Sequence, residues 1–168
     1  MNYNKEILKL IEHFESLHDG DLNVIGLQPK MCPAGYWTEG YGNVIRDPSG
    51  RMLKGKSDKD LAYKYTLVNT KEDAEKQLYE NIESYAKKVE KICYRHNFKP
   101  NENEFAALIS ISYNCGTGCL DYIIPRLQNG EQVEKVFGMW NKSAGVVLKG
   151  LVIRRASEAY FYRTAKFI

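Results

Sequence analysis

The apolar residues of the chain recur at helical spacing in three long segments. The first carries a stripe on one face of an N-terminal helix expected at 3–15: Ile7, Leu10, Ile11, Phe14 and Leu17. The second runs from Thr70 to about Arg95, and its opening letters TKED predict an N-terminal cap. The third has Asn101 as its expected N-cap and ends at Gly116.

Residues 16–70 show no such spacing. Glycine, proline, aspartate and aromatic residues dominate there, which is typical of short strands and turns, and the letters RDPSGR mark one turn. After Gly116, shorter helices are expected near 121–129, 131–141 and 151–163. The pattern therefore predicts an α+β fold, in which the long helix after Thr70 joins a small strand-rich lobe to a larger helical lobe.

These elements predict a single domain, 1–168, without internal repeats. We expect the strand-rich lobe at about 16–70 and the helical lobe at about 71–168, together with the N-terminal helix. A chain of 168 residues can bury a core without disulfide or metal cross-links. Its cysteines are too few for a disulfide scaffold, so free thiols in a reducing compartment are expected at Cys32, Cys93, Cys115 and Cys119.

The charge pattern argues against some partners. The net charge is +3, and lysine and glutamate are interspersed rather than gathered in a stripe, so we expect no nucleic-acid partner. A mild positive charge suits an anionic surface such as a bacterial envelope. The N-terminus lacks the apolar core of a secretory signal, and the longest uncharged run, Phe105 to Leu120, is too polar to span a bilayer. We therefore expect a cytosolic monomer with no stable membrane association.

Glu15 is the first candidate for chemistry. On a helical wheel it falls between Ile11 and Leu8, inside the apolar face, whereas Glu6 and Glu12 point elsewhere. Burial disfavours the charged form of a carboxylate, which suits a general acid that works near neutral pH. A structural ion pair with an arginine of the segment GLVIRRASE would explain the same position without catalysis.

The segment CPAGYWTEGYGN, 32–43, carries the second candidate. Gly40 and Gly42 flank a tyrosine, a spacing that lets the backbone turn tightly or approach a ligand. Because side chains alternate along a strand, one of Trp37 and Thr38 should face a cleft and the other the core of the lobe. Three aromatic rings offer faces on which sugars stack, or else pack within the hairpin: Tyr36, Trp37 and Tyr41.

Three blocks of sequence, FES…CPAGYWTEGYG, ALISISYNCGTG and GLVIRRASE, occur in an order that resembles the phage-type lysozymes, glycoside hydrolase family 24. The family signature is a Glu, then an Asp or Cys, five residues, and a Thr that leads into a G-Y-G turn. Cys32 and Thr38 have five residues between them, so this half of the signature matches. The blocks span nearly the whole chain.

This resemblance implies a lysozyme-like fold with a cleft between the lobes, and a muramidase that needs no metal or organic cofactor. The enzyme would hydrolyse the β-1,4 bond between N-acetylmuramic acid and N-acetylglucosamine in peptidoglycan glycan strands. Glu15 would be the general acid, and Cys32 and Thr38 would position the attacking water. An inverting outcome would follow, with the acid and the water-activating group roughly 6.5–9.5 Å apart.

Cys32 takes the place of a carboxylate in this interpretation. A thiol is only slightly ionised near neutral pH, so Cys32 would orient water more than deprotonate it. A small buried hydrophobic residue is the alternative role. The resemblance also implies an endolysin of a phage or prophage, made in the host cytoplasm, which reaches the wall after a factor such as a holin opens the membrane.

The sequence departs from the family pattern at three places. An insertion at 16–31 lengthens the gap between Glu15 and Cys32, so that Asp19 or Asp21 could be the acidic partner instead. Asn43 stands after G-Y-G, where many members carry His. Glu39 replaces the usual apolar residue after the Thr, and we expect it to be solvated on an exposed hairpin position.

The helical lobe supplies further candidates by the same resemblance. Tyr113 and Asn114 would contact the sugar and its N-acetyl group, with Val44 opposite them on the hairpin, although periodicity alone would place Tyr113 in the core. Arg154 and Arg155 lie three or four positions before Glu158, which favours pairing within one helix; the family instead suggests that one of them pairs with the general acid.

Other readings compete with a muramidase. Cys93 and His96, taken with Cys115 and Cys119, could be drawn as a zinc site. A cysteine peptidase or amidase would pair Cys32 with a histidine at 13, 18 or 96. A wall-binding module without turnover and a lytic transglycosylase also remain open. Products from purified wall distinguish all of these.

Overall fold

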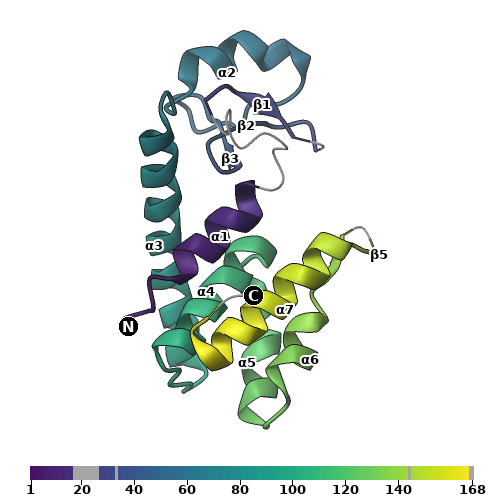
Figure 1. Cartoon of the computed structure of the whole chain (residues 1–168). Coiled ribbons are helices and arrows are strands. Elements are labelled where there is room, and N and C mark those ends of the chain that lie inside the picture. Colours follow the sequence, from purple (N-terminus) through teal and green to yellow (C-terminus); the bar gives the residue numbers. More distant parts are fainter. Residues whose placement is uncertain (17–26, 33, 144, 167–168) are drawn as a thin grey trace. The chain divides into compact units, whose positions relative to one another are not determined.

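A computed structural model describes residues 1–16, 27–32, 34–143 and 145–166 (Figure 1). The helices are α1 (Ile7–Ser16), α2 (Lys59–Tyr65), α3 (Lys71–Arg95), α4 (Glu102–Cys115), α5 (Leu120–Gln128), α6 (Val133–Gly138) and α7 (Lys149–Thr164), with 3-10 turns η1 (Lys56–Asp58) and η2 (Thr117–Cys119). The strands are β1 (Lys30–Met31), β2 (Trp37–Glu39), β3 (Asn43–Val44), β4 (Lys142–Ser143) and β5 (Val146–Val147). The predicted α+β class is confirmed.

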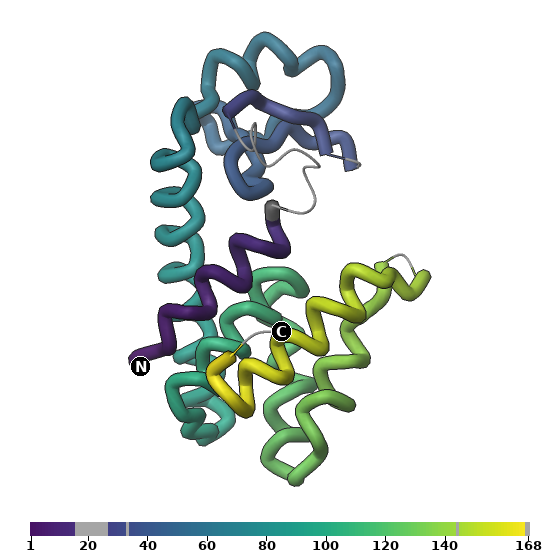
Figure 2. Tube along the Cα trace, viewed as in Figure 1, coloured from purple at the N-terminus to yellow at the C-terminus, as the bar shows by residue number. Residues whose placement is uncertain are grey.

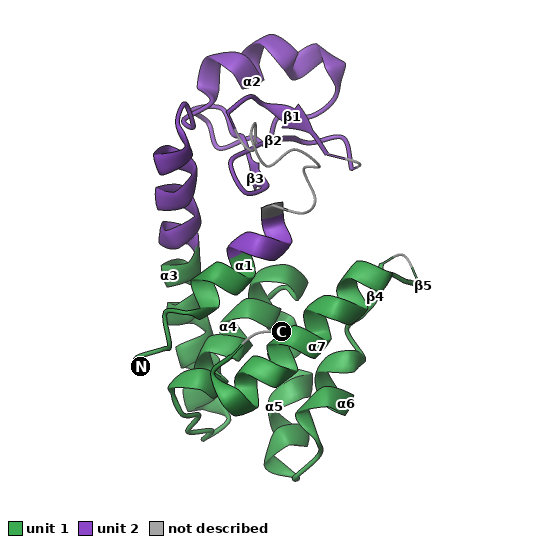
Figure 3. Ribbon diagram, in the orientation of Figure 1, with its two compact units in different colours: residues 1–11, 82–168 green, residues 12–81 purple. Residues whose placement is uncertain are grey.

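The chain forms two compact units (Figure 3). Unit 1 combines residues 1–11 with 82–168, and unit 2 comprises 12–81. The boundary crosses α3, the expected long helix, so its first turns belong to unit 2 and the rest to unit 1. One face of α3 is buried along its whole length. The buried residues on this face are small or apolar: Ala74, Leu78, Ile82, Ala86, Val89 and Cys93.

Unit 2 is built on a small antiparallel sheet in the order β1-β2-β3. Thr38 lies opposite Lys30 on one side and Val44 on the other. The core beneath the sheet contains Trp37 and Ile45, with Leu53 and Ala62 packed against them. The Trp37 indole N–H donates to the carbonyl of Gly55 at 2.8 Å, which satisfies its polar atom.

Helix α2 was not predicted from the sequence, which indicated only strands and turns at 16–70. The helix has seven residues, too few to show a repeating apolar stripe. Its buried Ala62 and the partly buried Leu61 and Tyr65 pack on the unit 2 core. Tertiary packing, rather than a local signal, therefore explains why this segment is helical.

Unit 1 surrounds α4, whose residues 105–112 are all buried. A helix that is buried on every side must be covered by neighbours, and α7 packs against both α4 and α6. The predicted N-cap is confirmed: the Asn101 side chain accepts from the backbone N–H groups of Asn103 and Glu104, and Glu104 accepts from the Asn101 N–H. The segment GVVLKG, which lies between the helices expected at 131–141 and 151–163, forms β5 and the start of α7.

The N-terminal segment is part of unit 1, and Figure 2 shows it beside the C-terminal part of α3. The Tyr3 hydroxyl donates to Glu83 at 2.7 Å, and the amino group of Met1 pairs with Glu90. No helix within the described ranges combines the length and the apolar character that crossing a bilayer requires.

Candidate active site

The last turn of α1 carries Glu15 in unit 2. Its side chain is half-buried, next to the buried Phe14, while His13 is exposed. The wheel predicted a position inside the apolar face, and the structure leaves the side chain half-buried rather than fully buried. Glu12, one turn earlier, is also half-buried, and its Oε1 accepts a hydrogen bond from the Tyr41 hydroxyl at 2.9 Å. Asp19 and Asp21, the alternative acids, lie outside the described residues.

Cys32 follows β1 in a tight turn. Its N–H donates to the Tyr36 carbonyl at 2.8 Å, and its carbonyl accepts from the Gly35 N–H at 2.8 Å. Gly35 has φ +82°, a left-handed conformation that favours glycine. The Cys32 thiol is half-buried and makes no disulfide. The turn thus fixes the cysteine backbone while leaving its side chain partly accessible.

Thr38 lies at the centre of β2 and is half-buried. Its hydroxyl donates to the Lys30 carbonyl at 3.1 Å. Because the hydroxyl hydrogen is used by this bond, the lone pairs of Oγ1 are left to accept a hydrogen from another molecule, such as a water. Val44 lies directly opposite Thr38 in the β2–β3 register, a pairing that the sequence did not predict.

The aromatic residues of this hairpin are mostly core residues. Trp37 is buried, so the expected alternation with Thr38 is confirmed, with the tryptophan on the inner side. Tyr41 is buried too, which excludes its ring and that of Trp37 from sugar stacking in this structure. Tyr36 remains half-buried, with the Lys54 ammonium 4.7 Å from the centre of its ring.

Glu39 is not the solvated residue that we expected; it is only 5% exposed. Its Oε2 accepts from the Thr66 hydroxyl at 2.6 Å and from the N–H groups of Leu67 and Val68 at 2.7 and 3.3 Å. Its Oε1 accepts from the Gln77 amide at 2.8 Å. The alternation that buries Trp37 also places Glu39 on the inner face, and this signal was present in the sequence.

Asn43 is the cross-strand partner of Glu39, and the side chains of both residues are hydrogen-bonded to α3. The Asn81 amide donates to the Asn43 side-chain oxygen at 2.7 Å. Gln77 and Asn81 are one turn apart on α3, so they lie on the same face of the helix. The two ends of the β2–β3 turn are thereby both fixed to the unit 2 part of α3.

In unit 1, Tyr113 and Asn114 occupy the last turn of α4. Tyr113 is half-buried and packs on the Tyr85 ring with 5.2 Å between the ring centres, whereas Asn114 is exposed. Tyr113 is therefore neither wholly a core residue nor freely exposed. The Asn114 side-chain oxygen accepts from the Cys115 thiol at 3.6 Å.

Arg154 and Arg155 are buried in α7 with Glu158, and the expected pairing within the helix is confirmed. Arg154 Nε lies 3.2 Å from Glu158 Oε1, and Arg155 Nε lies 2.8 Å from Oε2. The Ser110 hydroxyl of α4 donates to the same carboxylate at 2.7 Å. Arg155 Nη1 also donates to the Cys115 sulfur at 2.8 Å. Burial nevertheless raises the pKa of Cys115, so its thiol stays protonated at neutral pH.

The competing metal and cysteine-hydrolase readings gain no support from these placements. The described part of the chain contains no group of three or more His, Cys, Asp and Glu side chains that could hold a metal ion. His96 bonds to Asp121 at 2.7 Å within unit 1, and His18 lies outside the described residues. His13 is exposed and packs edge-on against Phe14.

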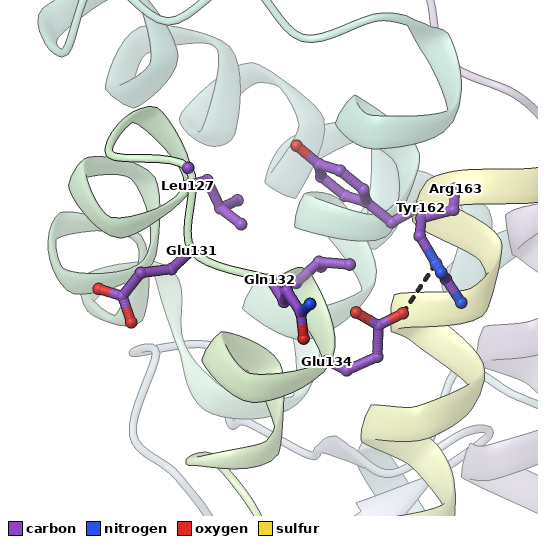
Figure 4. Close-up of a pocket in the computed structure, with 8 residues that line it drawn as sticks. Leu127, Glu131, Gln132, Glu134, Tyr162 and Arg163 are labelled. Carbon is purple, nitrogen blue, oxygen red and sulfur yellow. Dashed lines mark ion pairs between the residues drawn. The ribbon is translucent and has the colours of Figure 1, made fainter.

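Two pockets on unit 1 were not predicted. A pocket of about 440 Å³ is lined by residues that include Leu127, Glu131, Tyr162 and an ion pair of 2.7 Å between Arg163 and Glu134 (Figure 4). It contains none of the candidate site residues. A second, of about 340 Å³, includes Arg155 in its wall.

Comparison with known proteins identifies the family. The sequence model described as phage lysozyme matches residues 22–158. The chain is 27% identical over 170 residues to an endolysin of Bacillus phage B103, a match that includes 99% of this chain and 56% of that endolysin. It is 26% identical to a SAR-endolysin of Haemophilus phage HP1, over 77% of this chain and 68% of that protein.

A solved endolysin from Escherichia coli O157:H7 phage FAHEc1 has the same fold, with a TM-score of 0.70 and 27% identity over 100% of this chain and 97% of that one. The chain spans about half the length of the Bacillus phage endolysins that it matches. The family match covers most of the chain, including Cys32, Thr38 and the β2–β3 hairpin. The chain therefore belongs to the phage lysozyme family.

Proposed function

We propose that the protein is a phage endolysin with muramidase activity. It hydrolyses the β-1,4 bond between N-acetylmuramic acid and N-acetylglucosamine in bacterial peptidoglycan. The observation that carries the proposal is the family match over 22–158, which contains Cys32, five intervening residues and Thr38 before the G-Y-G turn. Membership of this family supports a glycoside hydrolase over a peptidase, an amidase or a binding module.

Glu15 acts as the general acid in this mechanism. Its position in the last turn of α1, at the edge of the apolar face and half-buried, keeps the carboxyl accessible while reducing its contact with water. It donates its proton to the glycosidic oxygen as that oxygen leaves. Glu15 is the glutamate of the FES block. This block precedes the matched region, in the order that the family resemblance implies, and that order supports the assignment.

Thr38 and Cys32 orient the water that attacks the anomeric carbon. Since the Thr38 hydroxyl hydrogen is bound to the Lys30 carbonyl, Oγ1 accepts a hydrogen from that water and turns a water lone pair toward the sugar. The half-buried Cys32 thiol limits how the water can move. Water adds on the face opposite the leaving group, its surplus proton passes to solvent, and the anomeric configuration inverts.

The remaining candidates bind or support the substrate region. We propose that Tyr113 and Asn114 contact the sugar and its N-acetyl group, that Val44 contributes an apolar surface beside Thr38, and that Arg154 and Arg155 support the site through their cluster with Glu158. As an endolysin, the protein would be made in the host cytoplasm and reach the wall when a factor such as a holin opens the membrane.

Digestion of purified peptidoglycan by wild type, Glu15→Gln and Cys32→Ala tests this function. Wild type is expected to release fragments with reducing N-acetylmuramic acid ends. Glu15→Gln should lower the rate about 10²- to 10⁴-fold, because a positioned general acid contributes that much. Cys32→Ala should retain activity, reduced about 10- to 100-fold by looser positioning of the water. Mass analysis of the fragments measures each outcome.

Glu6→Gln is the control, since Glu6 is exposed immediately before α1, where it pairs with Lys9, and should be replaceable without loss of activity. Anhydro ends would mean transglycosylation, and cleaved stem peptides would favour the cysteine hydrolase. Binding to intact wall without cleavage would leave a binding module. An unchanged rate in Glu15→Gln would contradict its assignment as the acid.

A further inference from the structure

The turn between β2 and β3 connects two parts of unit 2 that carry the proposed chemistry. Tyr41, at the tip of this turn, is three residues after Thr38. Its partner Glu12 lies one helical turn before Glu15 on α1. The Tyr41 hydroxyl donates to Glu12 Oε1 at 2.9 Å. A single hydrogen bond thus joins the strand that holds the proposed water-positioning residue to the helix end that holds the proposed acid.

The geometry of the turn fixes the Tyr41 backbone. Gly40 and Gly42 have φ values of +54° and +86°, left-handed conformations that an L side chain rarely adopts. A Cβ atom on Gly40 would lie 2.9 Å from Gln77 Oε1, so the turn sits close against α3 at this point. The E-G-Y-G sequence is therefore needed for the turn to reach this conformation.

The base of the same turn is held independently of Tyr41. Glu39 and Asn43, which pair across the two strands, bind Gln77 and Asn81 of α3 at 2.8 and 2.7 Å. Glu39 is also bonded to the segment 66–68. Because the hairpin is anchored to α3 by these bonds, loss of the Tyr41 hydroxyl should free the end of α1 rather than move the strand.

The electrostatic surroundings keep the Tyr41 phenol in its donor form. Burial, followed by the hydrogen bond to the Glu12 carboxylate and the nearby charge of Glu75, raises the pKa of Tyr41 above its ordinary value. The phenol therefore remains protonated over the whole range in which an enzyme of this kind would work. A donor that stays protonated and a carboxylate acceptor form a hydrogen bond stronger than a neutral pair.

We propose that Tyr41 and Glu12 are positioning residues whose hydrogen bond sets the separation between Glu15 and Thr38. The inference rests on the proposed function, because the spacing of Glu15 and Thr38 matters only if these two residues act on the substrate. Neither Tyr41 nor Glu12 is assigned a contact with the substrate. An inverting reaction requires the acid and the water-positioning group on opposite sides of the scissile bond at a defined spacing. A misplacement of about 1 Å can lower a rate about 10²-fold.

Kinetics of Tyr41→Phe, Glu12→Ala and the double variant on purified, suspended peptidoglycan test the proposal. Tyr41→Phe keeps the buried ring and removes one oxygen, and we expect kcat to fall about 10- to 100-fold while KM changes less than about twofold. Glu12→Ala should have a similar effect. The double variant should be no slower than the slower single one, because both substitutions remove the same bond.

Two further variants separate positioning from a merely structural role. Tyr3→Phe is the matched control: Tyr3 is nearly buried in unit 1 and donates to Glu83 at 2.7 Å, so its replacement removes the same kind of bond elsewhere. It should lower the melting temperature as Tyr41→Phe does and leave kcat unchanged. Glu12→Gln keeps an acceptor for the phenol and should restore kcat to within about threefold of wild type.

Three results would overturn the proposal: an unchanged kcat in Tyr41→Phe, effects of the two single variants that multiply in the double variant, or an equal loss of kcat in Tyr3→Phe. Failure of wild type to release reducing ends is a different outcome. It would refute the muramidase function itself, and this inference with it, whereas turnover without sensitivity at Tyr41 would refute the positioning role alone.

Discussion

Glu39 shows at the scale of one residue how a carboxylate is buried among neutral hydrogen-bond donors. Both oxygens accept hydrogen bonds from neutral donors: two backbone N–H groups, one hydroxyl and one amide. Hydrogen bonds to an ionised acceptor are stronger than neutral ones, which offsets the loss of hydration. Four such bonds also tie the end of β2 to the segment before α3 and to α3 itself.

Replacing Glu39 by Gln should be costly because an amide is not equivalent here. One carboxylate oxygen becomes an NH₂ group, which faces the donors of residues 66–68 in one orientation and the Gln77 amide in the other. The second orientation also requires the Gln77 amide to turn over, and in either case the charge that strengthens all four bonds is lost. We expect the free energy of unfolding to fall by about 2–4 kcal/mol, as for other buried donors left unpaired. Urea denaturation measures it. A loss no larger than in Glu80→Gln, an exposed position on α3, would contradict this account.

The residue-scale predictions succeeded where the signal was local. The i, i+3 and i, i+4 spacing of Glu158 from the two arginines predicted their pairing within α7. Glu39 was misjudged although its alternation with Thr38 indicated the same inner face as Trp37. Only its donors, in residues 66–68 and 77, lie too far along the chain for a local pattern to identify them. The roles of Cys32 and Thr38 in catalysis remain predictions.

Helices of this protein were predictable where their ends carry sequence signals. The helix α4 begins after a reciprocal cap between Asn101 and Glu104, and α3 begins with a similar exchange between Thr70 and Asp73. Helix α2 has no side-chain cap bond at its start, and the short strands have two or three residues each. Elements of that size are set by tertiary packing, so their positions could not be derived from the sequence.

Removal of the α4 cap should destabilise the element around which unit 1 packs. In Asn101→Ala, the N–H groups of Asn103 and Glu104 lose their acceptor, and we expect a loss of about 1 kcal/mol in the free energy of unfolding. Asn101→Ser is the control, because a serine hydroxyl also caps and should retain most of the stability. Equal losses in the two variants, measured by thermal and urea unfolding, would show that the cap contributes nothing.

At the scale of the whole molecule, stability at high pH depends on two thiols buried in unit 1. Burial raises the pKa of Cys93 to about 11 and that of Cys119 to about 12. Both groups are neutral in the folded protein at pH values where the unfolded chain already ionises its thiols. Each therefore contributes stability that is complete below about pH 9 and is lost as the pH rises toward its folded pKa.

Cys93→Ala should make the alkaline loss of stability smaller. From pH 7 to pH 10, ionisation of this thiol in the unfolded state should cost wild type about 1.5–2 kcal/mol that the variant does not lose. The variant will be less stable at pH 7 because it leaves a cavity, so the quantity to compare is the change with pH. Urea unfolding at both pH values measures it; parallel losses in the two proteins would refute the assignment.

Unit 1 is discontinuous in sequence, and this has a consequence for how the chain folds as it is made. The segment 1–11 leaves the ribosome before its partners in unit 1. Glu83, which binds Tyr3, and the Glu102 carbonyl, which binds the Asn4 N–H, follow only after the whole of 12–81. Unit 2 is continuous from residue 12 and can assemble on the emerging chain. Ile7, Leu10 and Ile11, which are buried in the finished protein, are meanwhile without the rest of unit 1, so this stretch is open to non-native contacts during translation.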